Sequence, residues 1–323
     1  MTTRTTSRYW RPDQHGAWPM IIAPVLIGLA WLLGLRSILS DAAPDALASG
    51  FRGGVGTFLT ALAVTVAWVV GYLTFFAGGK WLQARASGNT RIQDGARRPS
   101  LVYGAVTLVA VVCAVILQPH LLWWGIVFAP LTLIAVSEIR RGTPRSFIAG
   151  AAETVASAFL IPVLASVGVG SATPVVDGVT FTRSLFTTDV IEALPKEVWV
   201  TLLWLALYQV GTVLYVKTMI RKKGDRAWWI GSVAFHVAAL AITVLTVTSD
   251  HLGLLSWFLA VMVLGWAAWR AYAVPKDATS AEPSTEWTPK KVGIAEIPVV
   301  VGITLACLLA AGLYDGPLVL FIH

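Results

Sequence analysis

The chain has 323 residues, of which 56% are hydrophobic and only 13% are charged. An ordinary soluble domain carries about 25% charged residues, and a mean hydropathy of +0.73 points the same way. This composition predicts a polytopic membrane protein and excludes a large soluble domain. The net charge of +7 is assigned to loops that flank the membrane, so a nucleic-acid partner is not predicted.

Nine segments are long and apolar enough to cross a bilayer, which takes about 20 residues. They are predicted at 18–39, 55–78, 99–117, 120–138, 146–168, 198–220, 227–248, 252–270 and 293–313. No polar stretch between them is long enough to fold separately, so residues 1–323 are interpreted as a single all-α transmembrane domain. The basic N-terminus precedes an apolar run without a small-residue cleavage site, which favours a retained first helix.

Lysine and arginine residues fall unequally on the two sides of this arrangement. Of the 24 in total, 20 fall on the side of the N-terminus, and only Arg36, Arg52, Arg183 and Lys196 fall on the other. Because cytoplasmic loops are enriched in Lys and Arg, the N-terminus is predicted to be cytoplasmic and the C-terminus to lie outside a bacterial plasma membrane. One helix more or fewer would place every later loop on the opposite side of the membrane, and the unequal distribution of Lys and Arg would be lost.

Two connecting segments are long enough to hold structure of their own. The outer segment 169–196 is predicted to contain a short interfacial helix near 188–194. The inner segment 275–291 is polar and rich in turn-forming residues, so a flexible linker is predicted there.

An ionisable side chain inside a bilayer is costly, so each one is a functional candidate. Glu153 lies eight residues past Arg145 in the fifth span, about 12 Å into the membrane at 1.5 Å per residue. It is interpreted as a catalytic residue, with a structural hydrogen bond between helices as the alternative. Glu296 is predicted at the start of the ninth span, where a carboxylate would also stabilise the helix dipole.

Two histidines complete the set of residues predicted to carry protons. His236 lies near the middle of the seventh span, where a proton relay and simple packing are both open readings. His15 belongs to the polar run before the first span, next to Gln14. No second histidine lies at the helical spacing of a metal site, so no metal is predicted and no cofactor is indicated.

A second set of residues is predicted to bind an anionic group. Lys217 and Arg221 lie four residues apart at the end of the sixth span and share a helix face, which suits a phosphate or carboxylate. Snorkelling of both side chains towards the lipid headgroups is the alternative. The remaining members of the set are Gln14, Lys80, Arg98, Gln209 and Tyr215.

Four stretches together resemble the YwiC-like family of bacterial membrane proteins. They are Gln14-His15-Gly16-Ala17-Trp18 with Met20, Tyr215-Val216-Lys217-Thr218-Met219-Ile220-Arg221, His236, and Gly293-Ile294-Ala295-Glu296. The resemblance implies a membrane protein from a family without an established activity. A weaker architectural likeness is to the UbiA-type prenyltransferases, which hold magnesium and a diphosphate with Asp-rich motifs after the second and sixth helices. Those aspartates are missing from this sequence.

These observations favour a pocket that opens to the cytoplasm and binds or modifies an anionic or phosphorylated lipid or isoprenoid. A small-solute or proton-coupled transporter, with Glu153 and His236 in the pathway, is one alternative. An accessory protein that assembles a membrane complex is another. Apart from such a ligand, the predicted partner is the lipid bilayer itself.

Overall fold

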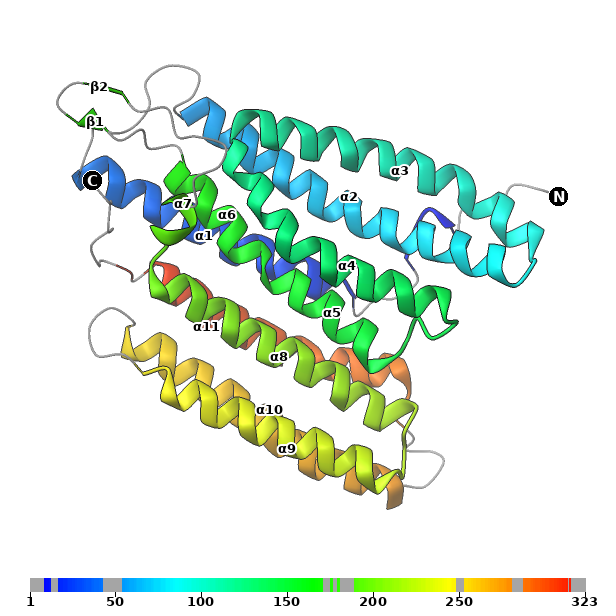
Figure 1. The fold of residues 1–323 in the computed structure, drawn as a ribbon. Coiled ribbons are helices and arrows are strands. Elements are labelled where there is room, and N and C mark those ends of the chain that lie inside the picture. Colours follow the sequence, from blue (N-terminus) through cyan, green and yellow to red (C-terminus); the bar gives the residue numbers. More distant parts are fainter. Residues whose placement is uncertain are drawn as a thin grey trace.

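The apolar segments of the sequence form long helices that run antiparallel to one another (Figure 1). The computed structural model describes residues 9–12, 17–42, 54–170, 175–176, 179–180, 189–247, 253–280, 287–312 and 314. Within these ranges, nine segments are long and apolar enough to cross a membrane. The prediction of an all-α, nine-span chain is therefore confirmed, and the protein is a multi-pass membrane protein.

The first five spans contain α1 (Ala17–Ala42), α2 (Gly54–Ala86), α3 (Thr90–Leu117), the 3-10 turn η4 (Pro119–Trp124) with α4 (Gly125–Arg140), and α5 (Phe147–Ala158) with α6 (Leu160–Gly170). The last four are α8 (Lys196–Ile220), α9 (Arg226–Leu245), α10 (Leu254–Ser280) and α11 (Pro289–Gly312). Between the two groups, β1 (Val175–Val176) pairs antiparallel with β2 (Val179–Thr180). The short helix α7 (Asp189–Glu192) follows, where the sequence predicts an interfacial helix.

One end of the bundle carries the connections 87–89, 141–146 and 221–225, which contain or adjoin lysine and arginine residues, and we call it the basic end. It lies at the right in Figure 1, whereas β1, β2 and α7 lie at the opposite end. In the sequence-based orientation the basic end faces the cytoplasm, and this assignment stays a prediction.

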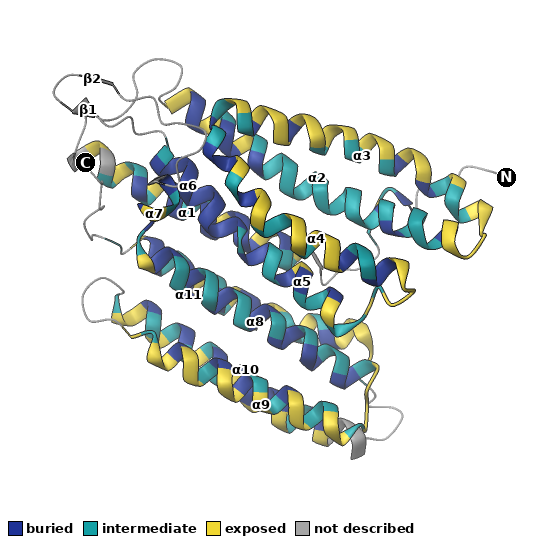
Figure 2. Ribbon diagram, in the orientation of Figure 1, coloured by how far each residue is buried: buried dark blue, intermediate teal, exposed yellow. Residues whose placement is uncertain are grey.

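Burial separates the core of the bundle from its flanks (Figure 2). In the most apolar window of the α8 span 56% of the residues are buried, against 11% in that of α3. The pair α2–α3 forms one flank and the pair α9–α10 the other, with α1, α5–α6, α8 and α11 between them (Figure 1). On α3, exposed side chains such as Leu101, Leu108 and Ile116 cover the outer surface, as expected for a helix that faces lipid.

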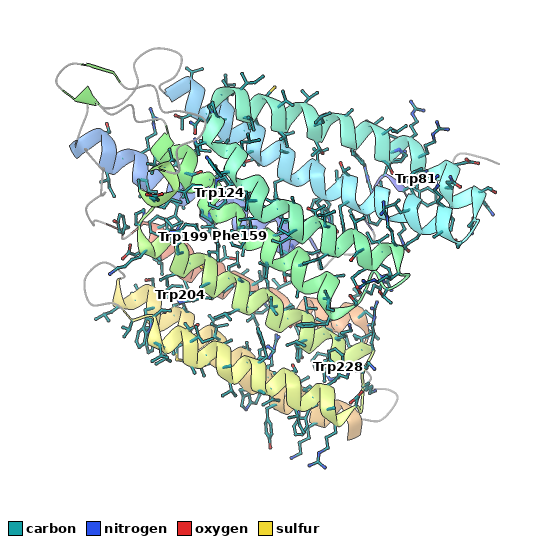
Figure 3. The ribbon with its side chains drawn as sticks, viewed as in Figure 1. Trp81, Trp124, Phe159, Trp199, Trp204 and Trp228 are labelled. Carbon is teal, nitrogen blue, oxygen red and sulfur yellow. The ribbon has the colours of Figure 1, made fainter. Side chains whose placement is uncertain are left out.

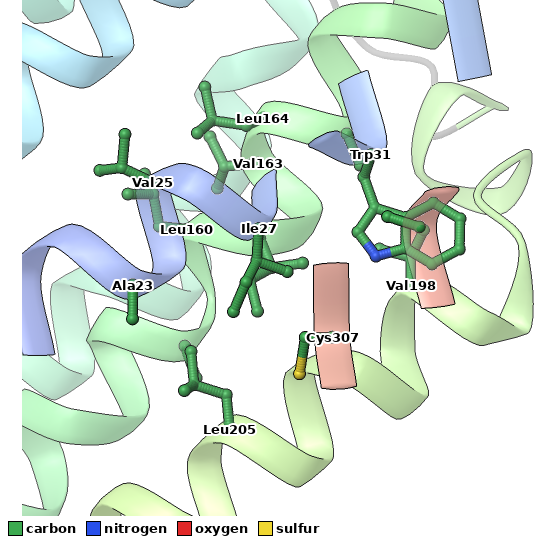
Figure 4. Close-up of a cluster of buried hydrophobic side chains, with 14 of the residues drawn as sticks. Ala23, Val25, Ile27, Trp31, Leu160, Val163, Leu164, Val198, Leu205 and Cys307 are labelled. Atoms are coloured by element: carbon green, nitrogen blue, oxygen red, sulfur yellow. The ribbon is translucent and has the colours of Figure 1, made fainter. Parts of the chain in front are cut away.

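The core lies where α1, α6, α8 and α11 meet (Figure 4). Ile27 of α1 and Leu164 of α6 are fully buried there, next to Cys307 of α11. The indole of Trp31 donates a hydrogen bond to Thr201 Oγ1 of α8 at 3.0 Å. Within a bilayer such a bond holds two helices together, because lipid cannot accept from the indole.

Two glycines allow α1 and α6 to approach closely. A Cβ atom at Gly168 would lie 2.8 Å from the Leu32 carbonyl oxygen, and one at Gly28 would lie 2.9 Å from the Leu164 side chain. Small residues at such contacts let the backbones of membrane helices touch. The close contact between α1 and α6 therefore depends on glycine at these two positions.

The fifth span differs from the single helix predicted at 146–168. It is divided into α5 and α6 at Phe159. Pro162 has no N–H to donate to the Ala158 carbonyl, so the ordinary helical ladder stops there. The linker predicted at 275–291 is also wrong at both of its ends, which are helical. Helix α10 continues to Ser280, and α11 begins at Pro289.

Substitution of Gly168 by alanine should destabilise the folded protein by about 1–3 kcal/mol, because the new methyl group would overlap backbone atoms of Leu32. The measurement is the unfolding midpoint of purified protein in micelles. Gly78→Ala is the matched control, since nothing lies within 4 Å of a Cβ atom at Gly78. Equal midpoints for the two variants would contradict the close contact.

The predicted orientation can be tested by cysteine labelling. In a variant whose Cys113 and Cys307 are replaced by alanine, a cysteine at Lys196 should react with an impermeant maleimide in intact cells. A cysteine at Lys223, in the basic connection 221–225, should react only after permeabilisation, because basic loops stay in the cytoplasm. The reverse pattern would invert the topology.

Candidate functional site

A buried ion pair joins α10 to α11 inside the predicted spans. Arg270 Nη2 contacts Glu296 Oε1, and Arg270 Nη1 donates to the Ala295 carbonyl at 2.8 Å. The two side chains are 8% and 12% exposed. Charges removed from water persist only when they are paired and hydrogen-bonded, so this pair constrains both helices.

Sequence reasoning places both members of this pair incorrectly. It assigns Arg270 to an inner loop and Glu296 to the first turn of its helix. Because α10 continues to Ser280, Arg270 lies inside the helix, and because α11 begins at Pro289, Glu296 lies about two turns in. The helix dipole therefore does not explain Glu296, since that effect is confined to the first turn.

A proline adjoins the pair on α11. Pro298 lacks the N–H that would bond the Ile294 carbonyl, and its ring crowds that turn. In the same turn the Ala295 carbonyl accepts from Arg270. The local sequence Ala295-Glu296-Ile297-Pro298 thus supplies an anionic group and an additional acceptor to the same guanidinium.

One face of α8 completes the network. Tyr208 Oη and Thr212 Oγ1 lie 3.1 Å and 3.3 Å from Glu296 Oε2, to which both donate. The ring of Tyr215 lies under the Arg270 guanidinium, with 4.6 Å between the guanidinium carbon and the ring centroid. Positions 208, 212 and 215 share one helix face. We call Tyr208, Thr212, Tyr215, Arg270 and Glu296 the buried network.

His236 packs beside this network without a hydrogen bond to it. Its Nδ1 lies 2.7 Å from the Ser232 carbonyl on its own helix α9. Its Nε2 faces Gly211 of α8, where a Cβ atom would lie only 2.9 Å away. Gly211 therefore makes the room that His236 occupies.

Gln209 points to the other side of α8. Its Nε2 lies 3.5 Å from both Ser157 Oγ and the Met20 carbonyl oxygen. Ser157 donates to the same carbonyl at 2.6 Å. Gln209 therefore links α8 to α1 and α5, and the structure does not bring it to the buried network.

Glu153 lies on the face of α5 that also carries Gly150 and Ser157. Gly150 contacts Val213 of α8, and Ser157 contacts α1. The Glu153 side chain is exposed, and the described part of the chain offers it no hydrogen bond or ion pair. It is therefore separate from the Arg270–Glu296 pair.

Three cations meet at the basic end of α5 and α8. Lys217 Nζ and Arg221 Nη1 donate to the carbonyl oxygen of Arg145, at 3.2 Å and 3.1 Å. Lys217 Nζ also lies 5.1 Å from the ring centroid of Trp228, which Figure 3 labels at this end. Partial burial, and then the charge of Arg145, lower the pKa of Arg221 from its usual value. We call Arg145, Lys217 and Arg221 the rim cluster.

The other predicted anion-binding residues lie apart from the rim cluster. Lys80 of α2 has its Nζ 5.9 Å from the ring centroid of Phe76, and Arg98 of α3 is exposed. Both helices belong to the α2–α3 flank (Figure 1). Gln14 and His15 lie outside the described residues.

A cavity of about 230 Å³ opens at the basic end between α8, α9 and α10. Its walls include Thr218, Asp225, Trp229, Pro275 and Lys276. None of the predicted catalytic or ligand-binding residues that the structure describes lines it. A search of the described residues for three or more metal-ligating side chains in one place finds none.

Comparison with known proteins finds a similarity to one family. Residues 12–165 match the profile of the family described as YwiC-like protein. Over 286 residues the chain is 24% identical to "Uncharacterized protein YwiC" of Bacillus subtilis, an alignment that covers 88% of this chain and 91% of that one. The resemblance to the YwiC-like family is confirmed. No solved structure matches the chain, and the UbiA-like arrangement stays a prediction.

The YwiC-like profile and the pairwise alignment cover different parts of the molecule. The profile ends within α6 and so includes neither the buried network nor Lys217 and Arg221 of the rim cluster. The alignment to the Bacillus protein has the length to include α8–α11 as well. Both features are therefore argued from the geometry of this chain and not from its similarity to that family.

The Arg270–Glu296 pair should show strong coupling in a double-mutant cycle. Arg270→Met or Glu296→Leu alone leaves one charge buried without a partner, which costs about 3–5 kcal/mol. The double variant should lose clearly less than the sum of the two single losses, because no charge remains. Unfolding free energies in micelles measure all three variants, and additive losses would show that the pair is not coupled.

Proposed function

We propose that this YwiC-like protein binds the phosphate-bearing headgroup of a lipid or isoprenoid at the rim cluster. The observation that carries the proposal is the convergence of Lys217 and Arg221 on a single carbonyl oxygen, that of Arg145. The two donor nitrogens are therefore no more than about 6 Å apart. Two cations at that distance repel each other, and an anion bound between them relieves the repulsion.

Donors remain available for such an anion. An ammonium has three N–H groups and a guanidinium has five, and the Arg145 carbonyl takes one from each side chain. Charge-assisted hydrogen bonds to phosphate are among the strongest that proteins make. The rim cluster can therefore keep its present contacts and still hold a phosphate.

The nearby carboxylate does not neutralise the cluster. Glu138 is the acidic group whose charge reaches Lys217. Its oxygens are engaged by Arg141 Nη1 at 3.1 Å and by Thr143 Oγ1 at 2.9 Å. The positive charge of the rim cluster is thus left for a ligand from outside the chain.

The surroundings also suit an amphiphile. Phe147 of α5 and Trp228 of α9 lie with ring centroids 6.5 Å apart, across the end of α8. Ile148 and Ile230, the residues beside or near them, are 57% and 51% exposed. An anionic head at the cations and an apolar tail along these helices would match the two parts of a phospholipid or an isoprenyl phosphate.

The double variant Lys217→Ala/Arg221→Ala should bind phosphatidate at least tenfold more weakly than the unmodified protein, because two charge-assisted hydrogen bonds are lost. Native mass spectrometry of the protein titrated with phosphatidate, and separately with farnesyl phosphate, gives the two affinities. Preference for one probe then distinguishes a glycerolipid from an isoprenoid.

Arg91→Ala/Arg97→Ala is the matched control. It removes two exposed positive charges from α3, also near the basic end, and leaves the rim cluster intact. Equal losses in the two double variants would reveal a general charge effect and would reject a specific site. Retention of phosphatidate and farnesyl phosphate by Lys217→Ala/Arg221→Ala would reject it as well.

A further inference from the structure

Three buried polar atoms on α8, α9 and α10 have no hydrogen-bond partner in the described structure, and two of them belong to the buried network. They are Tyr215 Oη on α8, Ser232 Oγ on α9 and Arg270 Nε on α10. The three residues are 1%, 1% and 6% exposed. A buried polar group without a partner is costly, and more so where lipid surrounds the bundle. Three in one region therefore indicate a bound molecule that completes them.

The three groups lie at similar depth from the basic end. Tyr215 lies five residues before the end of α8, and Ser232 lies six residues after the start of α9. Arg270 lies six residues before Lys276, where its span ends. At 1.5 Å per residue these separations are about 8–9 Å. Because α8, α9 and α10 pack against one another, the three side chains come from neighbouring helices at one level.

The cavity at the basic end lies about one helical turn from this level on α8 and α9. Thr218 and Trp229 line it, and each lies three residues nearer the basic end than Tyr215 or Ser232 on the same helix. Residues three apart share a helix face, so the cavity walls continue into the faces that carry the unpartnered groups. A volume of about 230 Å³ is enough for several water molecules or a small ion, at roughly 30 Å³ per water.

We propose that Tyr215, Ser232 and Arg270 form a site for a small carboxylate-sized anion, which enters from the basic end together with one proton. Each of the three groups can donate, and Arg270 cannot accept. The ligand must therefore bring acceptor oxygens. The site is distinct from the rim cluster, since positions 215 and 217 lie on different faces of α8.

The proton follows from charge balance. Arg270 and Glu296 already neutralise each other, so an added anion would leave one uncompensated negative charge in the core. A proton on Glu296 restores neutrality. The hydroxyl groups of Tyr208 and Thr212 can accept as well as donate, so they can hydrogen-bond either form of the carboxyl.

The helices packed against α11 supply few other charges at this position. From α10 the facing group is Arg270, and from α8 it is Tyr208 with Tyr215 behind the guanidinium. His236 of α9 packs on Gly211 of α8, and its printed hydrogen bond goes to the Ser232 carbonyl of its own helix and not to Glu296. The stretch 17–35 of α1 contains no ionisable side chain. Glu296 is therefore the group of this cluster that takes the proton.

The test uses full-length protein in nanodiscs of zwitterionic lipid with sodium formate as the probe. Calorimetry should show one formate bound per chain, and a weakly buffered solution should lose about one proton per formate bound. Tyr215→Phe should weaken formate binding about tenfold, the effect of one hydrogen bond to a charged group. Glu296→Gln, which resembles the protonated carboxyl, should bind formate without proton uptake.

Tyr272→Phe is the matched control, because Tyr272 is a tyrosine on α10 that is 47% exposed. Circular dichroism and unfolding midpoints verify that each variant is folded. Absence of formate binding to the folded unmodified protein would overturn the proposal. Formate binding to the unmodified protein without proton uptake would also overturn it. Equal formate affinities of the Tyr215→Phe and Tyr272→Phe variants would do the same. Phosphatidate retention by the same samples reports on the rim cluster separately.

Discussion

A backbone carbonyl inside a bilayer needs a donor from the protein, because lipid provides none. Prolines within the spans of this chain remove such donors, and side chains on neighbouring helices replace them. Pro24 has no N–H for the Met20 carbonyl, which instead accepts from Ser157 at 2.6 Å and lies 3.5 Å from Gln209. One proline in α1 thereby joins α1 to both α5 and α8.

In the last two spans the accepting carbonyl lies one residue after the one that the proline leaves without a donor. Near Pro298 of α11, the Ala295 carbonyl accepts from Arg270 of α10. Near Pro275 of α10, the Tyr272 carbonyl accepts from the indole of Trp229 of α9 at 3.2 Å. These bonds tie α9, α10 and α11 into a unit that contains the Arg270–Glu296 pair and one wall of the cavity. Helix contacts in this protein are thus specified by polar groups as well as by packing.

Helix α8 lies between two polar environments. Its face with Gln209, Val213 and Lys217 meets α1 and α5. Its face with Tyr208, Thr212 and Tyr215 meets α10 and α11. The rim cluster and the buried network are therefore on opposite sides of one rigid helix, and a tilt or rotation of α8 would displace both. This geometry gives a physical route by which a ligand at one site could alter the other.

The spans could be predicted because hydropathy depends on composition alone. The site could be predicted only in part. Glu296, Tyr215, Lys217 and Arg221 were recognisable as costly polar groups at or within spans. The partner Arg270 was not, because its assignment depends on where α10 ends, and helix ends are the least certain feature of a sequence pattern. The spacing of Tyr208, Thr212 and Tyr215 was a usable signal for a common face.

Glu153 and Glu296 show what the sequence leaves undetermined. Both are single carboxylates within apolar spans near the basic end, so their depth in the membrane does not distinguish them. Glu296 meets a guanidinium and two hydroxyl groups, whereas Glu153 is exposed beside residues that contact α1 and α8. The difference lies in how each helix is rotated and which neighbour it faces, and those follow from tertiary packing. A carboxylate with three donors is held in place, whereas an exposed one to which the described residues donate no hydrogen bond can meet lipid or a ligand.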